Sequence, residues 1–202
     1  MGLKIQNTEP DLLFRPAVES DMKDVWQIYD YYVKNTAITF DYATPTQEEM
    51  TRSMLEIRKI YPYLVCLRKG VVVGYAYARA VSPREAYKWS VELSIYLDVS
   101  MLGGGIGWRL YEKLINLLEA QHVQTAYACI THPNPRSEHL HQALGFSLLS
   151  FWRHSGYKFQ SWHDVVWMEK RLGKLPTPAP DLIPFPKLNP KVVEKILWQN
   201  AE

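Results

Sequence analysis

Four glycines lie within five residues, at a junction between an apolar run and an amphipathic segment. They are Gly103, Gly104, Gly105 and Gly107, and they directly precede the most regular helical pattern in the chain. Glycine tolerates positive φ and lets a ligand approach the backbone, and the first amides of a helix have no intrahelical partner. The junction therefore predicts a binding site for a phosphate or pyrophosphate group.

Two common phosphate-binding motifs do not fit this junction. The dinucleotide fingerprint G-x-G-x-x-G would need a third glycine where the chain has Leu110, counting from Gly105, or Trp108, counting from Gly103. A P-loop would need a Gly-Lys-Ser/Thr sequence, and no such lysine follows the first glycine. A pyrophosphate cradle of another kind and a flexible surface turn are the remaining interpretations.

Glu92 lies in the apolar run that leads into the glycine junction, between Val91 and Leu93. A carboxylate in such a strand can simply face solvent from a half-buried sheet. Beside an anion site, however, it could remove a proton from a substrate, directly or through a water molecule. Glu92 is therefore a candidate general base.

The six histidines do not predict a metal site, because no pair has metal-ligand spacing. His139 and His141, two residues apart on a predicted helix, face different directions. His141 is either a packing histidine or a proton donor or substrate contact near neutral pH.

No side chain has the sequence setting of a nucleophile. There is no G-x-S-x-G elbow, and Cys66 and Cys129 both lie in apolar runs, where we expect reduced core thiols. Direct attack by a substrate atom on an activated carrier is therefore the simpler mechanism.

The hydrophobic pattern predicts a mixed α+β sheet and not a regular doubly wound fold. Ser20-Asp21 should cap the first helix, whose aromatic stripe is more typical of core than of a ligand wall. Thr46 and Glu49 form a capping box for the second helix, and Lys69-Gly70 should turn a hairpin. The expected strands are 12–16, 63–68, 71–80, 89–97, 125–131, 146–154 and 162–172, and the expected helices are 22–33, 46–61, 110–118, 136–144 and 191–199.

Composition indicates one domain, at residues 1–172, followed by a proline-rich tail at 173–202 with a possible short helix. The 23 basic and 21 acidic residues leave no large excess of positive charge to attract nucleic acid or a membrane. Residues 1–10 lack the apolar core of a signal peptide, and no stretch has the length of a membrane span. We expect a cytoplasmic protein.

Four stretches of the chain resemble the GNAT superfamily of acyl-CoA-dependent N-acetyltransferases, and more closely its phosphinothricin acetyltransferase family. They are 87–97 (YKWSVELSIYL), 105–107 (GIG), 140–146 (LHQALGF) and 156–165 (GYKFQSWHDV). The resemblance implies the GNAT fold, in which helices flank a mixed, mostly antiparallel sheet with a splayed central strand pair. It also implies a homodimer and acetyl-CoA as co-substrate, with no metal.

The same resemblance implies roles for individual residues. Glu92 matches the proposed general base, and His141 would protonate the thiolate. The coenzyme would contact Ile95, Tyr96, Leu97, Gly103, Gly104, Gly105, Ile106, Gly107, Trp108 and Asn134. The substrate pocket would comprise Phe40, Arg84, Tyr87, Ser94, Cys129 and Val165, with Arg84 binding a substrate carboxylate.

Two positions depart from the family pattern. Leu102 stands where the superfamily usually has Gln or Arg, which bears on coenzyme affinity, and Ser82 stands where herbicide-detoxifying members have a basic residue. The predicted activity is acetyl transfer to the α-amino group of a small L-amino acid or analogue of the phosphinothricin, methionine sulfoximine or methionine sulfone type. The alternatives are a polyamine, aminoglycoside or protein N-terminus as acceptor, and a non-catalytic acyl-CoA-binding module.

Overall fold

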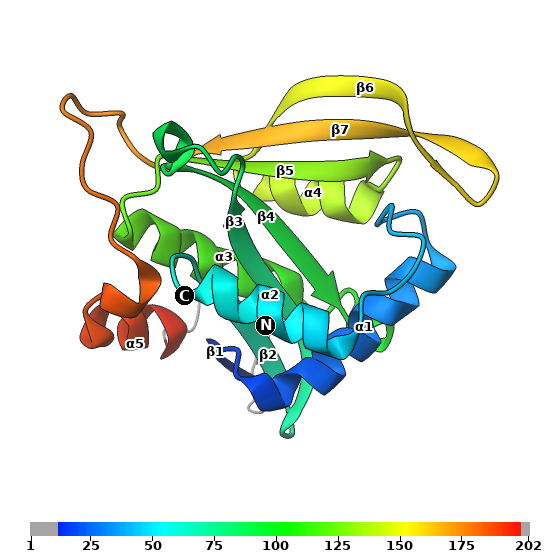
Figure 1. The fold of residues 1–202 in the computed structure, drawn as a ribbon, viewed down its shortest axis with the longest axis horizontal. Helices are drawn as coiled ribbons and strands as arrows, with labels where there is room; N and C mark the ends of the chain where they lie inside the picture. Colours follow the sequence, from blue (N-terminus) through cyan, green and yellow to red (C-terminus); the bar gives the residue numbers. More distant parts are fainter. Residues whose placement is uncertain (1–11, 199–202) are drawn as a thin grey trace, which may run out of the picture.

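The computed structural model describes residues 12–198 and forms one open, seven-stranded sheet in the order β1-β2-β3-β4-β5-β7-β6 (Figure 1). Every neighbouring pair is antiparallel except β4 and β5, which are parallel. The strands are β1 (Leu12–Pro16), β2 (Tyr63–Arg68), β3 (Val71–Ala80), β4 (Ser90–Leu97), β5 (Thr125–His132), β6 (Ser147–Lys158) and β7 (Ser161–Arg171). The helices are α1 (Met22–Asn35), α2 (Gln47–Arg58), α3 (Ile106–Ala120), α4 (Pro135–Ala143) and α5 (Pro190–Trp198).

The two faces of the sheet carry separate hydrophobic clusters, because successive side chains of a strand point to opposite faces. In β2, Leu64 and Cys66 join the cluster that contains α3, whereas Tyr63 and Val65 join the cluster that contains α1 and α2. The helices thus form a layer on each side of the sheet (Figure 1). The predicted α+β class with a mostly antiparallel sheet is confirmed.

Local sequence signals decide most helix and turn boundaries. The Thr46 hydroxyl accepts from the Glu49 amide, and the Glu49 carboxylate accepts from the Thr46 amide, so the predicted capping box of α2 is confirmed. Lys69 and Gly70 both have positive φ in the predicted hairpin turn. Asp21 is the N-cap residue of α1, as predicted, but its side chain makes no capping hydrogen bond to this helix. The Asp21 carboxylate instead accepts from Arg15 and from the Val18 amide.

The parallel pairing of β4 with β5 is short, and this places a gap in the centre of the sheet. The pairing joins residues 90–92 to residues 125–127, whereas β4 stays paired with β3 as far as Leu97. Beyond Glu92 the two strands diverge, which is visible in Figure 1. The splayed central strand pair expected from the resemblance is therefore present.

The hairpin of β6 and β7 is longer than the sequence pattern predicted. β6 continues to Lys158 instead of ending at residue 154, through an irregularity in the register between Trp152 and Gly156. Residues 153–156 are polar or glycine, so the hydrophobic pattern ends before the strand does. The strand continues because its backbone still pairs with β7 beyond this segment.

The chain beyond Gly173 packs on its own molecule. Residues 173–189 are largely irregular, and α5 lies against α3 and β1. Phe185, Leu188 and Leu197 are buried in the core cluster that contains α3. The boundary between a domain at 1–172 and a tail at 173–202 stays a prediction, and the expectations for residues 1–10 and Gln199 lie outside the described residues. No helix within residues 12–198 is long and apolar enough to cross a membrane.

The packing of α5 predicts that substitutions at two adjacent residues change the free energy of unfolding by very different amounts. Leu197 is 7% exposed and Trp198 is 71% exposed. Leu197→Ala should lower the free energy of unfolding by about 2–3 kcal/mol because it leaves a cavity against α3. Trp198→Ala should change it by no more than about 0.5 kcal/mol. Urea unfolding of the full chain measures both, and equal effects would contradict the docking of α5.

Candidate active site

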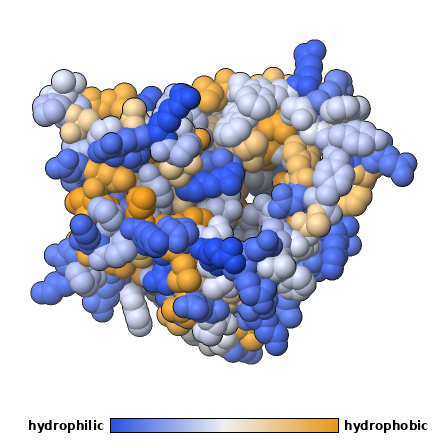
Figure 2. Space-filling view, viewed as in Figure 1, coloured by the Kyte–Doolittle hydropathy of each residue, from blue (hydrophilic) through white to orange (hydrophobic). Residues whose placement is uncertain are grey.

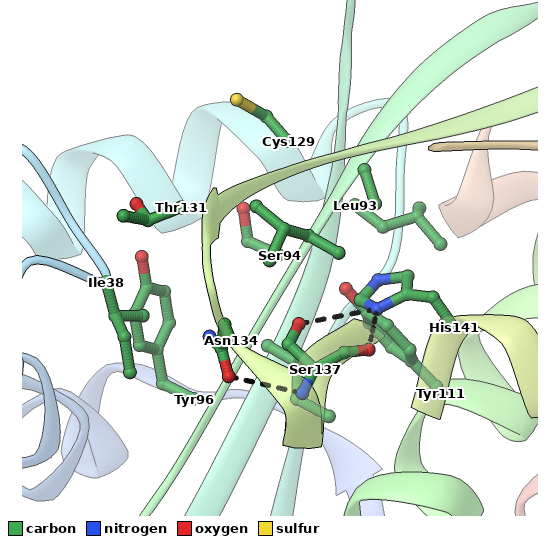
Figure 3. Close-up of a pocket in the computed structure, with 13 residues that line it drawn as sticks. Ile38, Leu93, Ser94, Tyr96, Tyr111, Cys129, Thr131, Asn134, Ser137 and His141 are labelled. Atoms are coloured by element: carbon green, nitrogen blue, oxygen red, sulfur yellow. Dashed lines mark hydrogen bonds between the residues drawn. The ribbon is translucent and has the colours of Figure 1, made fainter. Parts of the chain in front are cut away.

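Two connected clefts open where β4 and β5 diverge. The inner cleft, of about 400 Å³ including its open mouth, lies between β4, β5 and α4 (Figure 3). The outer cleft, of about 1170 Å³ including its mouth, lies on the side of α1 and α2, where Figure 2 shows the surface hollowed. They share Ile38, Ser94, Tyr96, Cys129 and Thr131, so the two clefts adjoin at these five residues, and we call this junction the passage.

Strand alternation decides which side chains line the outer cleft. Arg79 lies opposite Glu92 in the register of β3 and β4, Tyr77 opposite Ser94, and Tyr75 opposite Tyr96. All six share the face of the sheet that carries α1 and α2, and all six line the outer cleft. The intervening Val91 and Leu93 are buried in the core on the other face.

A cluster of tyrosines forms one wall of the outer cleft. Tyr63 stacks on Tyr77 with ring centroids 4.9 Å apart, and Tyr75 stacks on Tyr96 at 5.5 Å. Burial raises the pKa of Tyr63, Tyr75 and Tyr96 well above the usual value, so these phenols are neutral. Tyr29 also lines the cleft, which means that the aromatic stripe of α1 is in part a ligand wall and not only core.

Glu92 is held by Arg79. Nη2 of Arg79 donates to both carboxylate oxygens of Glu92, at 3.1 Å each. The Glu92 side chain is 17% exposed and the Arg79 side chain 55% exposed, so the pair opens into the cleft. Although burial opposes it, the Glu92 carboxylate raises the pKa of Arg79. Glu92 is thus an anchored carboxylate at the point where the two strands separate.

Carboxylates outnumber cations along the outer cleft. Among the described residues that line it, Asp41, Glu49 and Glu92 are acidic and Arg79 alone is basic. Asp41 accepts from the Tyr29 hydroxyl at 2.7 Å, and Glu49 is engaged in the capping box of α2. Glu92 and Arg79 both act electrostatically on Cys129, one of the residues shared by the two clefts.

His141 lies in the wall of the inner cleft with a defined tautomer. Its Nδ1 donates to the carbonyl oxygen of Ser137 at 2.7 Å, which requires the proton on Nδ1 and leaves a lone pair on Nε2 (Figure 3). Nε2 is buried and has no hydrogen-bond partner among the described residues. The ring packs against Tyr111 and Phe146. Burial lowers the pKa of His141, so the imidazole is neutral at pH 7 and presents an acceptor.

The glycine junction has the backbone geometry of an anion site. Gly103 and Gly105 have φ of +92° and +75°, and α3 begins at Ile106. The first intrahelical bond is from the amide of Arg109 to the carbonyl of Gly105, so the amides of residues 106–108 have no partner in the preceding turn. Gly107 packs closely on Leu97, and an added Cβ would lie 3.4 Å from that side chain.

The inner edge of β4 offers backbone groups to a ligand. Ile95, Tyr96 and Leu97 pair with β3 on one side and have no strand partner on the other, because β5 has already diverged. The Leu97 carbonyl accepts from the Tyr32 hydroxyl at 2.8 Å. Asn134 begins α4, and its side-chain oxygen accepts from the Ser137 amide. Ile95 and Tyr96 on this edge line the inner cleft together with Asn134 and Ser137.

The structure brings half of the residues that the sequence analysis selected to the two clefts. Those lining the inner cleft, the outer cleft or both are Phe40, Glu92, Ser94, Ile95, Tyr96, Cys129, Asn134, His141 and Val165. Arg84 and Tyr87 lie exposed on the loop between β3 and β4 and line neither cleft. Their substrate contacts, like the other assigned roles, stay predictions.

The structure corrects the interpretation of Cys129 as a core thiol. Cys66 is buried, but Cys129 is exposed at the passage between the clefts, because the divergence of β5 from β4 uncovers it. Neighbouring groups that displace water, together with the Glu92 carboxylate, raise the pKa of the Cys129 thiol to about 11.

Sequence reasoning missed Arg79 and Tyr111, which line the outer and inner clefts. The alternation of Tyr75, Tyr77 and Arg79 along one strand was a signal that they share a face. Tyr111 had no such signal, because it interrupts an otherwise aliphatic helix face. Within residues 12–198, no group of three or more His, Cys, Asp or Glu side chains is arranged to hold a metal ion.

The burial of His141 predicts a pH-dependent stability. Its pKa is lowered from 6.5, so below about pH 6.5 the unfolded chain binds a proton that the folded chain does not. The free energy of unfolding should therefore fall with decreasing pH, by at most about 1.4 kcal/mol per pH unit from this residue. His141→Gln should flatten the dependence measured by urea unfolding between pH 7.5 and 5.5. His139→Gln, on the exposed side of the same helix, should keep it, and parallel curves for all three proteins would contradict the assignment.

Comparisons with known proteins agree with this geometry. Residues 14–167 match the family model of the acetyltransferase (GNAT) domain. The phosphinothricin N-acetyltransferase of Streptomyces viridochromogenes is 34% identical over 174 residues, which is 86% of this chain and 94% of the relative. An L-methionine sulfoximine/L-methionine sulfone acetyltransferase of Salmonella typhimurium is 28% identical, over 83% of this chain and 98% of the relative. A crystal structure of a phosphinothricin acetyltransferase from Sinorhizobium meliloti with acetyl-CoA has a TM-score of 0.79 and 34% identity over 89% of this chain and 96% of that one. The chain therefore belongs to the GNAT family of N-acetyltransferases, enzymes that use acetyl-CoA as co-substrate.

Proposed function

We propose that this enzyme transfers an acetyl group directly from acetyl-CoA to the α-amino group of a small L-amino acid or analogue. The observation that carries the proposal is the passage between the two clefts: the outer cleft is lined by Glu92 and the inner cleft by His141. A thioester in the inner cleft and an amine in the outer cleft would meet at the point where β4 and β5 separate. The names of the relatives favour phosphinothricin, methionine sulfoximine or methionine sulfone as the type of acceptor.

The chain offers three sets of groups for the coenzyme. The amides of Ile106, Gly107 and Trp108, with the turn of Gly103 and Gly105, would hold the pyrophosphate. The backbone of residues 95–97 would pair with the pantetheine, and Asn134 would contact it from α4. Because backbone amides make the cradle, the apolar Leu102 at its start is compatible with binding of the anion.

Glu92 acts on the acceptor before bond formation. An α-ammonium group must lose a proton before its nitrogen can attack the thioester carbonyl, and Glu92 accepts that proton, directly or through water. A backbone amide near Ile95 would stabilise the tetrahedral oxyanion. Because the nitrogen attacks the carbonyl itself, no acyl-enzyme forms, and the exposed Cys129 is a wall of the passage and not a nucleophile.

His141 completes the proton transfer. When the nitrogen has bonded to the carbonyl carbon it carries an extra proton, and the C–S bond breaks to release a thiolate. Nε2 of neutral His141 can accept the proton from nitrogen and deliver it to sulfur, which yields the amide and the free thiol of the coenzyme. The bond from Nδ1 to Ser137 keeps Nε2 directed for this task.

One observation favours a second class of acceptor. The outer cleft is lined by more carboxylates than cations, and Arg84 is not among its lining residues. A polyamine, an aminoglycoside or a protein N-terminus would suit acidic walls. The position of Ser82, where herbicide-detoxifying members have a basic residue, likewise leaves the phosphinate itself as one acceptor among several.

A cytoplasmic location stays a prediction.

Thiol release from acetyl-CoA tests the function. The wild-type enzyme should release thiol with phosphinothricin, methionine sulfoximine, methionine sulfone or a common amino acid, and the N-acetylated product should appear in equal amount by mass spectrometry. Glu92→Gln should lower kcat/KM by about 10²- to 10⁴-fold, because the base is lost.

The matched control for this substitution is Glu85→Gln, whose carboxylate is 88% exposed outside the clefts and should leave kcat/KM unchanged. Activity confined to polyamines or aminoglycosides would support the second class of acceptor. A Glu92→Gln enzyme with wild-type kcat/KM at every pH would exclude the base role.

We further propose that two copies of the chain associate through the edge formed by β6 and β7. β6 is an edge strand, and large apolar side chains of this hairpin are exposed, namely Leu148, Leu149, Phe151, Trp152 and Trp162. An unpaired edge with exposed aromatic residues is typical of an association surface. A second copy of the chain suits this surface because it carries the same unpaired edge and the same exposed side chains, so the two surfaces can pair with each other.

Sedimentation of the full chain tests this association. The wild-type protein should sediment as a dimer, and Trp152→Glu should shift it towards the monomer by placing a charge in the apolar contact. Trp198→Glu, which changes a still more exposed tryptophan on α5, should remain dimeric. A wild-type monomer at high concentration would refute the dimer, and dissociation by Trp198→Glu alone would move the contact to α5.

A further inference from the structure

Arg79 occupies a position in the outer cleft for which the proposed chemistry has so far no use. It is the single cation among the described residues that line this cleft, and it lies directly across from Glu92 in the sheet register. Its guanidinium contacts both oxygens of the Glu92 carboxylate. Both charges act on Cys129: Glu92 raises the pKa of its thiol and Arg79 lowers it. An opposite pair of charges therefore faces the passage through which the acceptor must approach.

This pair presents a conflict if Glu92 alone receives the acceptor. The ammonium group must come within hydrogen-bond distance of a carboxylate whose two oxygens already accept from Arg79. The ion pair is open to solvent, and such pairs are only weakly held. The conflict disappears if the incoming molecule supplies a new partner for each member of the pair.

We propose that Arg79 binds the α-carboxylate of the acceptor while Glu92 receives its α-ammonium group. An α-amino acid carries these two opposite charges on groups attached to one carbon. Its zwitterion can therefore replace the single ion pair between Arg79 and Glu92 with two ion pairs, one to each residue. Arg79 suits the task because its planar guanidinium stays charged and can hold a carboxylate through two parallel hydrogen bonds. The inference rests on the proposed function and names the group that selects the acceptor.

The position of Arg79 distinguishes it from Arg84, the residue that the sequence analysis selected for the same task. Arg84 lies exposed on the loop between β3 and β4 and lines neither cleft. Arg79 extends from β3 beside the tyrosine wall and lines the outer cleft, and 55% of its side chain is exposed to solvent. The acidic residues along the outer cleft would repel a substrate carboxylate. Among the described residues that line the cleft, only Arg79 has the positive charge to offset this repulsion.

Arg79 has an alternative role that the experiment must separate. It could merely orient Glu92, in which case its loss would impair every acceptor to the same extent. A carboxylate-binding residue would instead impair only acceptors that carry the carboxylate. The readout is therefore a ratio of kcat/KM values: that for an amino acid divided by that for its α-carboxamide, measured with the same enzyme.

The experiment uses the best amino acid from the wild-type screen and its α-carboxamide, with Arg79→Gln, Arg79→Lys and Arg84→Gln. Arg79→Gln should lower kcat/KM for the amino acid roughly 10- to 100-fold, chiefly through a higher KM, and change that for the carboxamide by less than about 3-fold. Arg79→Lys should lie between Arg79→Gln and wild type. Arg84→Gln should keep the wild-type ratio. An unchanged KM for acetyl-CoA in each variant shows that the fold and the inner cleft are intact.

Two results would overturn the inference while the proposed function stands. An equal loss for the amino acid and the carboxamide in Arg79→Gln would reduce Arg79 to orienting Glu92. A collapse of the ratio in Arg84→Gln, with the ratio kept in Arg79→Gln, would assign the carboxylate to Arg84. Failure of the proposed function is seen separately, in the wild-type enzyme, as thiol release with amines but with no amino acid, and that result also removes a carboxylate for Arg79 to bind.

Discussion

The site depends on a single structural constraint: β4 pairs with β5 only as far as Glu92. A strand that stayed paired would close the centre of the sheet and satisfy its own backbone. Because β5 diverges, the edge of β4 from residue 93 onward is open, and the two clefts adjoin there. The glycine turn at the end of β4 and the start of α4 then lie at the two sides of that opening.

The alternation of side chains along β4 divides the work of the strand. Val91 and Leu93 anchor it in the core beneath α3, whereas Glu92, Ser94 and Tyr96 face the outer cleft. Packing on one face therefore holds the Glu92 carboxylate in place on the other. The open edge of the same strand is left for the backbone contacts of a ligand, so one strand serves packing, chemistry and binding at once.

Electrostatics at the two ends of the passage differ because burial differs. In the pair of Glu92 and Arg79, more than half of the Arg79 side chain is exposed to solvent. His141 is enclosed by Tyr111 and Phe146, so its imidazole is neutral and its tautomer is set by Ser137. In the proposed reaction, the acceptor would therefore approach an ion pair and the thioester would lie beside a neutral imidazole.

The sequence by itself determined the elements, the glycine turn and the family, because hydrophobic period, capping residues and short motifs are local properties. It also selected Glu92 and His141, through their place in those motifs. Only the tertiary structure decided which side chains meet: the divergence of β5 exposed Cys129, strand register joined Arg79 to Glu92, and the loop left Arg84 outside the clefts. These depend on pairing between residues far apart in the chain, which no local pattern encodes.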